Sequence, residues 1–303
     1  MLYSPEPVIS VRDLRMRYGT HEVLEGVEFE IGRGEVICLL GPNGAGKTTT
    51  IEILEGFRMR SAGEVDVLGE DPARAGEDWR ARTGVVLQSW RDHPRWTPRR
   101  LLSQLGGYYA PYSTPEVERP VAVDALLEMV GLDKLADQKI VTLSGGQRRR
   151  LDVAMGIVGR PELLFLDEPT AGFDPQARRE FHHVVHRLAD LERTTVLLTT
   201  HDLDEAEKLA DRVLILAGGR IVADDTAEQL ALRAAVDVEV KWSRDGERFV
   251  HATKDATAFL RRLLDEHGDA VVDLEVRRAS LEDAYLELVG RKELSRARGE
   301  ILP

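Results

Sequence analysis

The hydrophobic and polar positions at the start of the chain alternate in two neighbouring segments. VISVRDLRMRY (8–18) and HEVLEGVEFEI (21–31) place apolar residues at about every second position, with Gly19 and Thr20 between them. Such alternation predicts two strands, each with one buried face, joined by a turn. The next run, GEVICLL (34–40), is continuously apolar in its second half, as expected of a strand buried on both faces.

The middle of the chain alternates between helical and strand-like patterns. From about residue 90 to 159 apolar residues recur at three- and four-residue spacing, which is typical of helices. Two further buried-strand runs follow, LLFLDE (163–168) and TTVLLTTH (194–201), separated by an amphipathic segment at 177–191. Strands that alternate with helices predict an α/β fold with a mostly parallel sheet and helices on its faces.

The pattern changes again after residue 225. The segments 236–242 and 248–253 predict a hairpin, and a helix at 256–266, a strand at 270–278 and a helix at 280–289 follow. We place the boundary at 228–234, which divides the chain into a domain of residues 1–230 and a small α+β domain of residues 231–303.

Composition excludes several classes of protein. No apolar run approaches the 18 residues of a membrane-spanning helix, and the first ten residues carry two prolines and a glutamate instead of the apolar core of a signal peptide. The single cysteine, Cys38, excludes an intramolecular disulfide and is compatible with a reducing compartment. A net charge of -12 argues against nucleic-acid binding, and we expect no nucleic-acid partner.

The segment LLGPNGAGKTTTIEIL (39–54) carries the first functional motif. Gly41 to Thr48 match the phosphate-loop pattern, in which glycines let successive backbone N–H groups point at one anion and the following helix adds its positive dipole end. Lys47 is expected at the β- and γ-phosphates and Thr48 at Mg²⁺. Asn43 is the only asparagine in the sequence, so the asparagine-containing motif that reads guanine is absent.

A pair of acids follows the second buried strand. Asp167 and Glu168 end the run LLFLDE, and the carboxyl ends of strands are where α/β sheets hold ligands. Asp167 suits the Mg²⁺ shell, and Glu168 is placed to polarise a water against the γ-phosphate. The alternative interpretation of Asp167 and Glu168 is a pair of exposed acids in a helix-capping turn. That interpretation would be favoured if the sequence had no phosphate loop.

The segment TLSGGQRRRLDVAMGIV (142–158) decides the family. It starts a second helix with Ser144 as N-cap and two glycines, and Leu143 to Gln147 read LSGGQ, which resembles the signature of ABC ATPases. The resemblance covers residues 8–225 and implies the phosphate-loop ABC cassette, with an antiparallel β subdomain, a mostly parallel core sheet and a helical subdomain at about 90–158. The arginines at 148–150 are expected to be solvated helix charges.

The resemblance also assigns roles outside the phosphate loop. Tyr18 resembles the aromatic residue that stacks on adenine, and Gln88, at a strand end, resembles the glutamine that contacts Mg²⁺ and the attacking water. Asp174, in AGFDP, resembles the D-loop aspartate, although Phe173 stands where the family often has leucine. His201 resembles the switch histidine near the γ-phosphate. The residues expected at the nucleotide are Tyr18, Gly41, Pro42, Asn43, Gly44, Ala45, Gly46, Lys47, Thr48, Thr49, Ser144, Gly145, Gly146, Gln147 and Asp174.

Together these motifs imply an ATPase that uses ATP and Mg²⁺, with Glu168, His201 and Gln88 as catalytic residues and Thr48, Gln88 and Asp167 around the metal. In the family two subunits enclose two nucleotides head to tail, and one set of motifs per chain therefore implies a homodimer. The ending ASLEDAYLELVG (279–290) resembles drug-export ATPases of the daunorubicin-resistance type, whose permease is a separate membrane chain.

The resemblance therefore implies a cytosolic ATPase subunit of a drug exporter, bound to the cytoplasmic face of the membrane through its permease. The segment 89–112, which mixes aromatics with arginines, is a candidate docking groove for the permease or a solvated basic face. A soluble ATPase that works on ribosomes or DNA, and a sodium or polysaccharide exporter subunit, remain alternatives. The C-terminal domain is expected either to regulate the ATPase or to strengthen the dimer.

Overall fold

The two N-terminal segments of alternating polarity form the antiparallel sheet that was predicted for them. In this computed structural model, strands β1 (Ile9–Tyr18), β2 (His21–Ile31) and β4 (Ala62–Val67) pair in the order β2-β1-β4, with the turn at Gly19 and Thr20. The apolar residues of one face, such as Val11, Leu14 and Val27, are almost fully buried. The buried face explains the alternation because successive side chains of a strand point to opposite sides.

The structure describes residues 7–86, 94–170, 173–234, 238–277 and 280–298. By its internal contacts the chain divides into two units, Met1–Asp224 and Asp225–Pro303. The boundary predicted from the sequence, between residues 230 and 231, falls inside helix α8 (Ala227–Ala234), which belongs to the second unit. Within the described part of the chain, no helix combines the length and the apolar character needed to cross a bilayer.

The central sheet of the first unit has six strands in the order β5-β6-β7-β3-β8-β9. The pairs β5–β6, β6–β7, β7–β3 and β3–β8 are all parallel, so the expected mostly parallel sheet is confirmed. The strands are β3 (Val36–Leu40), β5 (Thr83–Val86), β6 (Leu163–Asp167), β7 (Thr195–Thr199), β8 (Arg212–Ala217) and β9 (Arg220–Asp225). Every residue of β3 and β7 is buried, which explains why their sequences lack alternation.

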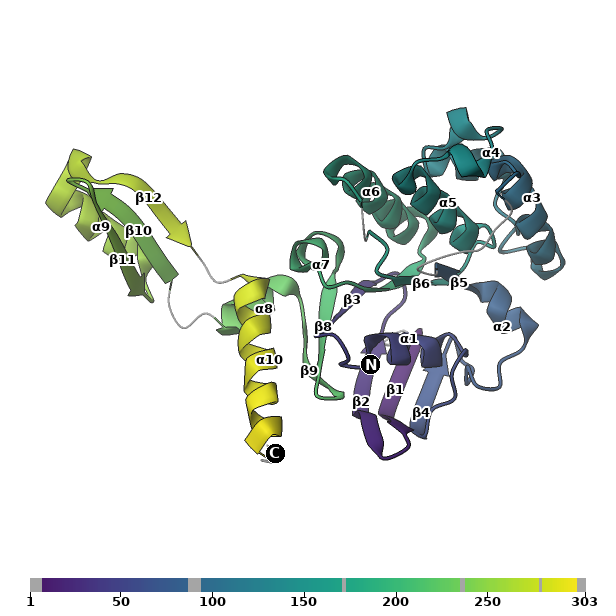
Figure 1. The fold of residues 1–303 in the computed structure, drawn as a ribbon, viewed down its shortest axis with the longest axis horizontal. Helices are drawn as coiled ribbons and strands as arrows, with labels where there is room; N and C mark the ends of the chain where they lie inside the picture. The colour runs from purple at the N-terminus through teal and green to yellow at the C-terminus, as the bar shows by residue number, and fades with distance from the viewer. Residues whose placement is uncertain (1–6, 87–93, 171–172, 235–237, 278–279, 299–303) are drawn as a thin grey trace. The chain divides into compact units, whose positions relative to one another are not determined.

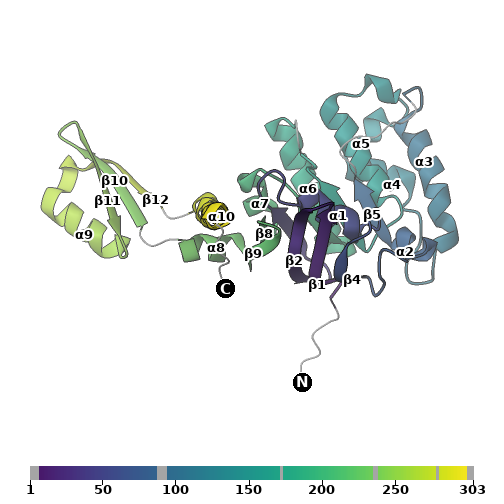
Figure 2. The ribbon, with the colours of Figure 1, turned by 60° about the horizontal axis from the view of Figure 1, so that its bottom comes forward.

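Seven α-helices are described in the first unit, and three of them are grouped. Figures 1 and 2 show α3, α4 and α5 side by side at one end of the unit, where the helical subdomain was expected. The helices are α1 (Lys47–Leu54), α2 (Glu77–Arg82), α3 (Pro98–Tyr109), α4 (Val123–Met129), α5 (Gly145–Ile157), α6 (Pro175–Glu192) and α7 (Leu203–Leu209).

One continuous apolar core joins the antiparallel sheet to the central sheet. It contains residues from β1, β2 and β4, the buried side of α1 and central-strand residues such as Phe165 and Leu197. Trp79 of α2 is 1% exposed and donates its indole N–H to the carbonyl of Val67 over 2.7 Å. The core therefore fixes α1, and the loop that precedes it, between the two sheets.

The second unit matches the predicted hairpin, helix, strand and helix. Strands β10 (Val238–Arg244), β11 (Glu247–Thr253) and β12 (Val272–Arg277) form an antiparallel sheet in the order β11-β10-β12. Helix α9 (Ala256–His267) packs Phe259 against Trp242 of β10, with ring centroids 5.6 Å apart. Helix α10 (Leu281–Arg298) closes the described chain.

Candidate functional site

The loop between β3 and α1 has a backbone that favours glycine at three positions. A Cβ on Gly41 would collide with the carbonyl oxygen of Leu216, and one on Gly46 would lie 2.5 Å from the side chain of Leu24. Gly44 and Gly46 also have φ values of 78° and 106°, in the left-handed region. These constraints curl the loop in the way that a phosphate cradle requires, at the N-terminus of a helix.

Lys47 begins α1 and turns back over this loop. Its ammonium donates hydrogen bonds to the carbonyl oxygens of Gly41, at 2.7 Å, and Pro42, at 3.2 Å. Burial lowers the pKa of Lys47, and the nearby carboxylates of Glu168 and Asp167 oppose that shift by favouring the charged form. The side chain therefore lies beside the loop, with acids facing it, where its charge can be offered to a phosphate.

The two acids at the end of β6 are fixed by the neighbouring strand β7. The Thr199 hydroxyl donates to Asp167 over 2.5 Å, and the backbone N–H of Glu168 donates to both the carbonyl and the hydroxyl oxygen of Thr199 at 3.1 Å. Glu168 has a φ of 43°, which is rare for a residue other than glycine. The sequence analysis did not identify Thr199, although this residue forms hydrogen bonds with both acids.

His201 reaches the same place from the end of β7. Its Nδ1 lies 3.3 Å from the Oε1 of Glu168. The side chain of His201 is 66% exposed and that of Glu168 is 26% exposed, so the pair faces solvent on one side. The carboxylate of Glu168, which can accept a proton, therefore lies beside the imidazole of His201. Both are close to Lys47 and the phosphate loop.

The signature segment forms the N-terminus of α5. Ser144 Oγ accepts from the backbone N–H of Gln147 at 3.3 Å, and the Gln147 side chain accepts from the Ser144 N–H at 2.9 Å. This reciprocal capping box leaves Gly145 and Gly146 between the two caps; a Cβ on Gly145 would meet nothing within 4 Å, and one on Gly146 would meet only the Cβ of Ala177. Among the described residues, no hydrogen bond or ion pair joins Ser144–Gln147 to the phosphate loop of the same chain.

The other predicted residues occupy varied positions. Tyr18 ends β1 with 43% exposure, and the guanidinium of Arg58 lies 5.4 Å from its ring centroid. Asp174 caps α6 by accepting from the backbone N–H groups of Gln176 and Ala177, both at 2.9 Å. Thr48 is exposed and Thr49 half-buried in the first turn of α1, while Gln88 lies outside the described residues.

The interpretation of the three arginines after the signature as solvated charges is wrong for the middle one. Arg149 is 8% exposed and donates to the backbone carbonyls of Pro169, at 2.8 Å, and Asp167, at 3.1 Å. Its spacing to Val153 and Gly156, which are both buried, places the three on one face of α5. That spacing was a usable signal for burial, but charge alone suggested a solvent-facing position. Arg148 and Arg150 are partly exposed and pair with Asp152 and Glu180.

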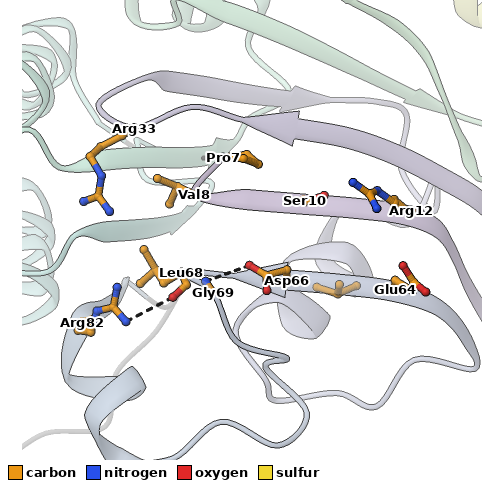
Figure 3. A pocket seen from close by; sticks show the side chains of 11 residues that line it. Pro7, Val8, Ser10, Arg12, Arg33, Glu64, Asp66, Leu68, Gly69 and Arg82 are labelled. Atoms are coloured by element: carbon orange, nitrogen blue, oxygen red, sulfur yellow. Dashed lines mark hydrogen bonds between the residues drawn. The ribbon is translucent and has the colours of Figure 1, made fainter. Parts of the chain in front are cut away.

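A separate pocket of about 550 Å³ lies along β1 and β4 (Figure 3). None of the residues predicted at the nucleotide lines it. Three of its charged residues are already engaged: Asp66 accepts from the Gly69 N–H, and Arg82 donates to Leu68 O and, with Arg33, to Glu162. Lys47, Glu168 and His201, which are expected to act in nucleotide binding or hydrolysis, lie instead beyond the carboxyl ends of β3, β6 and β7.

A glycine-rich loop between a buried strand and a helix, with an acid pair at the end of a second strand two positions away in the same parallel sheet, defines a P-loop nucleotide hydrolase. Residues 24–171 match the ABC transporter family. The chain is 36% identical to the Nod factor export ATP-binding protein I of Ralstonia nicotianae over 94% of its length and 95% of the relative's. It therefore belongs to the ABC transporter family.

Two further relatives are named for the export of drugs or for resistance to them. The daunorubicin resistance ATP-binding protein DrrA2 of Streptomyces coeruleorubidus is 37% identical, over 92% of this chain and 94% of the relative. A fluoroquinolones export ATP-binding protein of Mycobacterium tuberculosis is 35% identical over 94% of both chains. These relatives confirm the predicted class, the ATP-hydrolysing subunit of an ABC exporter, and do not favour the ribosome or DNA alternative.

Solved structures confirm the predicted cassette fold. The ADP conformation of an ATP-binding cassette of an ABC transporter superposes with a TM-score of 0.62 at 25% identity, over 74% of this chain and 92% of that one. The ATP-binding subunit of an ABC transporter gives a TM-score of 0.64 at 24% identity, over 93% of this chain and 99% of that one.

Proposed function

We propose that this chain hydrolyses Mg²⁺-bound ATP as a homodimer and drives export of a drug-like or lipophilic compound through a separate integral membrane permease. The observation that carries the proposal is the position of Glu168, which follows β6 at the same edge of the sheet as the phosphate loop, 3.3 Å from His201 and near the charge of Lys47. In this proposal the protein binds the permease at the cytoplasmic face of the membrane.

The nucleotide would lie along the loop that follows β3. In this arrangement the loop's N–H groups and the ammonium of Lys47 bind the phosphates, and the half-exposed ring of Tyr18 receives the adenine. The hydroxyl of Thr48 and the carboxylate of Asp167 are oxygen ligands of the kind that Mg²⁺ prefers, and the exposed position of Thr48 fits that role. The metal would neutralise charge on the phosphates.

Hydrolysis would use the acid and the imidazole together. Glu168 accepts a hydrogen bond from the attacking water and draws its proton away, while His201, beside it, contacts the γ-phosphate or the same water. Gln88, which the family resemblance places at Mg²⁺ and the water, belongs to the same proposal. The hydrogen bonds that the Glu168 N–H donates to Thr199 support this role because they fix the backbone that carries Glu168.

The dimer follows from the position of the signature. Ser144, Gly145 and Gly146 form a second helix start with the properties of an anion site, and among the described residues no hydrogen bond or ion pair links it to the chain's own phosphate loop. A second copy placed head to tail would bring this helix start over the partner's γ-phosphate. Asp174, at the N-terminus of α6, would lie in the same interface.

The transport proposal rests on the full-length similarity to export subunits and is tested by purification. The tagged protein, expressed with its neighbouring genes, is extracted in a mild detergent and isolated with whatever binds it. We expect a polytopic permease to copurify and to change the ATPase rate. Copurification of ribosomes or DNA instead would contradict the proposal.

A further inference from the structure

Arg149 joins the signature helix to the backbone on both sides of Glu168. Its Nη2 donates to the carbonyl of Asp167, the residue before the acid, and its Nε donates to the carbonyl of Pro169, the residue after it. We infer that Arg149 is a positioning residue for hydrolysis, which holds the Glu168 peptide unit so that the carboxylate faces the nucleotide. This inference rests on the proposed catalytic role of Glu168.

The backbone at Glu168 needs such support because it is strained. A φ of 43° costs an ordinary residue free energy, and such a conformation persists only where the surroundings fix it from several sides. The N–H of Glu168 is held by Thr199 of β7, and the two flanking carbonyls are held by Arg149 of α5. Rotation of the peptide group between Asp167 and Glu168 would break the bonds to Thr199 and one bond from Arg149, and rotation of the carbonyl of Pro169 would break the other bond from Arg149.

The arginine is itself fixed in place. It is 8% exposed, and its other nitrogen lies 3.9 Å from the carboxylate of Asp152 one turn later in the helix. Burial lowers the pKa of Arg149, and the carboxylates of Asp152 and Asp167 oppose that shift, so the guanidinium stays charged. Two carbonyls and a carboxylate therefore offset the loss of water around the guanidinium.

Helix α5 is also packed rigidly against the sheet further along its length. A Cβ on Gly156 would lie 2.5 Å from the side chain of Val86, so the helix and β5 approach as closely as glycine allows. The N-terminal turn of the same helix carries Ser144 and Gly146, the proposed contacts to the partner's nucleotide. Arg149 therefore links a helix that contacts one nucleotide to the acid that acts on the other.

The test compares matched substitutions in the full-length protein by steady-state ATPase assay and by binding of a fluorescent ATP analogue. R149M should lower kcat at least about tenfold, with the KM and the dissociation constant for ATP within about threefold of wild type. R149K, which keeps a cation with several donors, should return kcat to within about threefold of wild type. If the R149M protein does not fold, R149Q is used in its place. The shorter amide side chain of glutamine keeps a hydrogen-bond donor but lacks the forked guanidinium group.

Arg150 supplies the control because it is the next residue and is also paired. It donates to Glu180 and to the carbonyl of Gly131, and in the described part of the chain no hydrogen bond or ion pair joins it to β6. R150M should keep kcat within about twofold of wild type even if it lowers the thermal midpoint. A folded R149M protein with kcat within threefold of wild type would overturn the inference.

The double variant R149M/E168Q separates a positioning role from a general structural one. Because Arg149 acts through Glu168, the residual kcat of the double variant should equal that of E168Q within about threefold. ATP should also still drive dimer formation by the double variant, as for E168Q. Additive losses, or loss of ATP-driven dimers only when Arg149 is replaced, would show that it serves the helix and not the acid. Turnover by E168Q at the wild-type rate would instead refute the proposed function.

Discussion

The Nδ1 of His201 lies 3.3 Å from the Oε1 of Glu168, although the two residues follow different strands. The contact exists because β6 and β7 are parallel neighbours, with Asp167 opposite Thr199 in the register. Parallel neighbours bring their carboxyl ends to one edge of the sheet, and β3 brings Lys47 to the same edge. The predictions below test what this edge does.

Replacing Glu168 with glutamine should keep ATP binding and slow hydrolysis at least about a hundredfold, because an amide does not draw a proton from water as a carboxylate does. Phosphate release and size-exclusion chromatography with ATP measure the two effects, and we expect an ATP-bound dimer to accumulate. Asp204→Asn, which changes an exposed acid of α7, is the control and should leave turnover unchanged. Near-normal turnover of Glu168→Gln would remove Glu168 from the catalytic role.

Replacing Lys47 with alanine should weaken ATP binding about tenfold or more, because charge-assisted bonds to phosphate are lost. The same change also deletes the bonds that hold the side chain to Gly41 and Pro42. Titration with a fluorescent ATP analogue measures the affinity, with Lys208→Ala as the exposed control. Unchanged affinity together with unchanged hydrolysis would show that Lys47 does not bind phosphate.

Mixing two inactive variants should restore activity if each site is shared between subunits. Lys47→Ala damages the phosphate loop, and Gly146→Asp puts a carboxylate where the signature should meet a γ-phosphate. A Cβ on Gly146 meets only the Cβ of Ala177, at 3.4 Å, so the local fold should tolerate the change. Random pairing would restore up to about a quarter of wild-type turnover, from one intact composite site per mixed dimer.

The mixing experiment needs a tagged pull-down, which verifies that mixed dimers form, and each variant incubated alone as its control. Restored turnover in a verified mixed dimer would support the head-to-tail arrangement. If ATP is bound at the intact site and turnover stays absent, the two motifs do not form independent shared sites.

Truncating the chain after Asp225, where β9 ends, should leave a folded protein that binds ATP, because every proposed nucleotide residue precedes it. Dimerisation or transport should suffer more than nucleotide affinity. Thermal unfolding and ATP titration of the truncated protein check this. An insoluble product would contradict the division into two units.

Glu55 at the end of α1 should make stability depend on pH. Burial, with further repulsion from Asp167 and Glu52, raises the pKa of Glu55 from 4.5 to about 8. A carboxyl whose pKa is raised on folding contributes stability below pH 4.5 that is lost as the pH rises to about 8, by up to about 5 kcal/mol.

Glu55→Gln removes this titration, so the variant should exceed the wild type in unfolding free energy at pH 8, by a margin that shrinks toward pH 5. Urea unfolding of both proteins from pH 5 to 9 measures the difference, and other titrating groups cancel in the comparison. A difference that does not change with pH would mean that Glu55 titrates normally.

The sequence by itself determined the features that consecutive residues build. The phosphate loop could be recognised because its donors are successive N–H groups, and the buried strands because β3 and β7 lack alternation. The signature was recognisable for the same reason, since Ser144 and Gln147 cap one helix turn between themselves. Local geometry of this kind can be predicted from the sequence because neighbouring residues form it.

Only the tertiary structure decided which distant groups meet. The strand order β6-β7-β3 places Glu168, His201 and Lys47 at one edge, and residue order alone does not state that strand order. The sequence predicted Arg149 to be one of three solvated charges, because charged residues of helices usually face water. Its burial follows from the packing of α5 on the sheet, which places carbonyls that need donors within its reach.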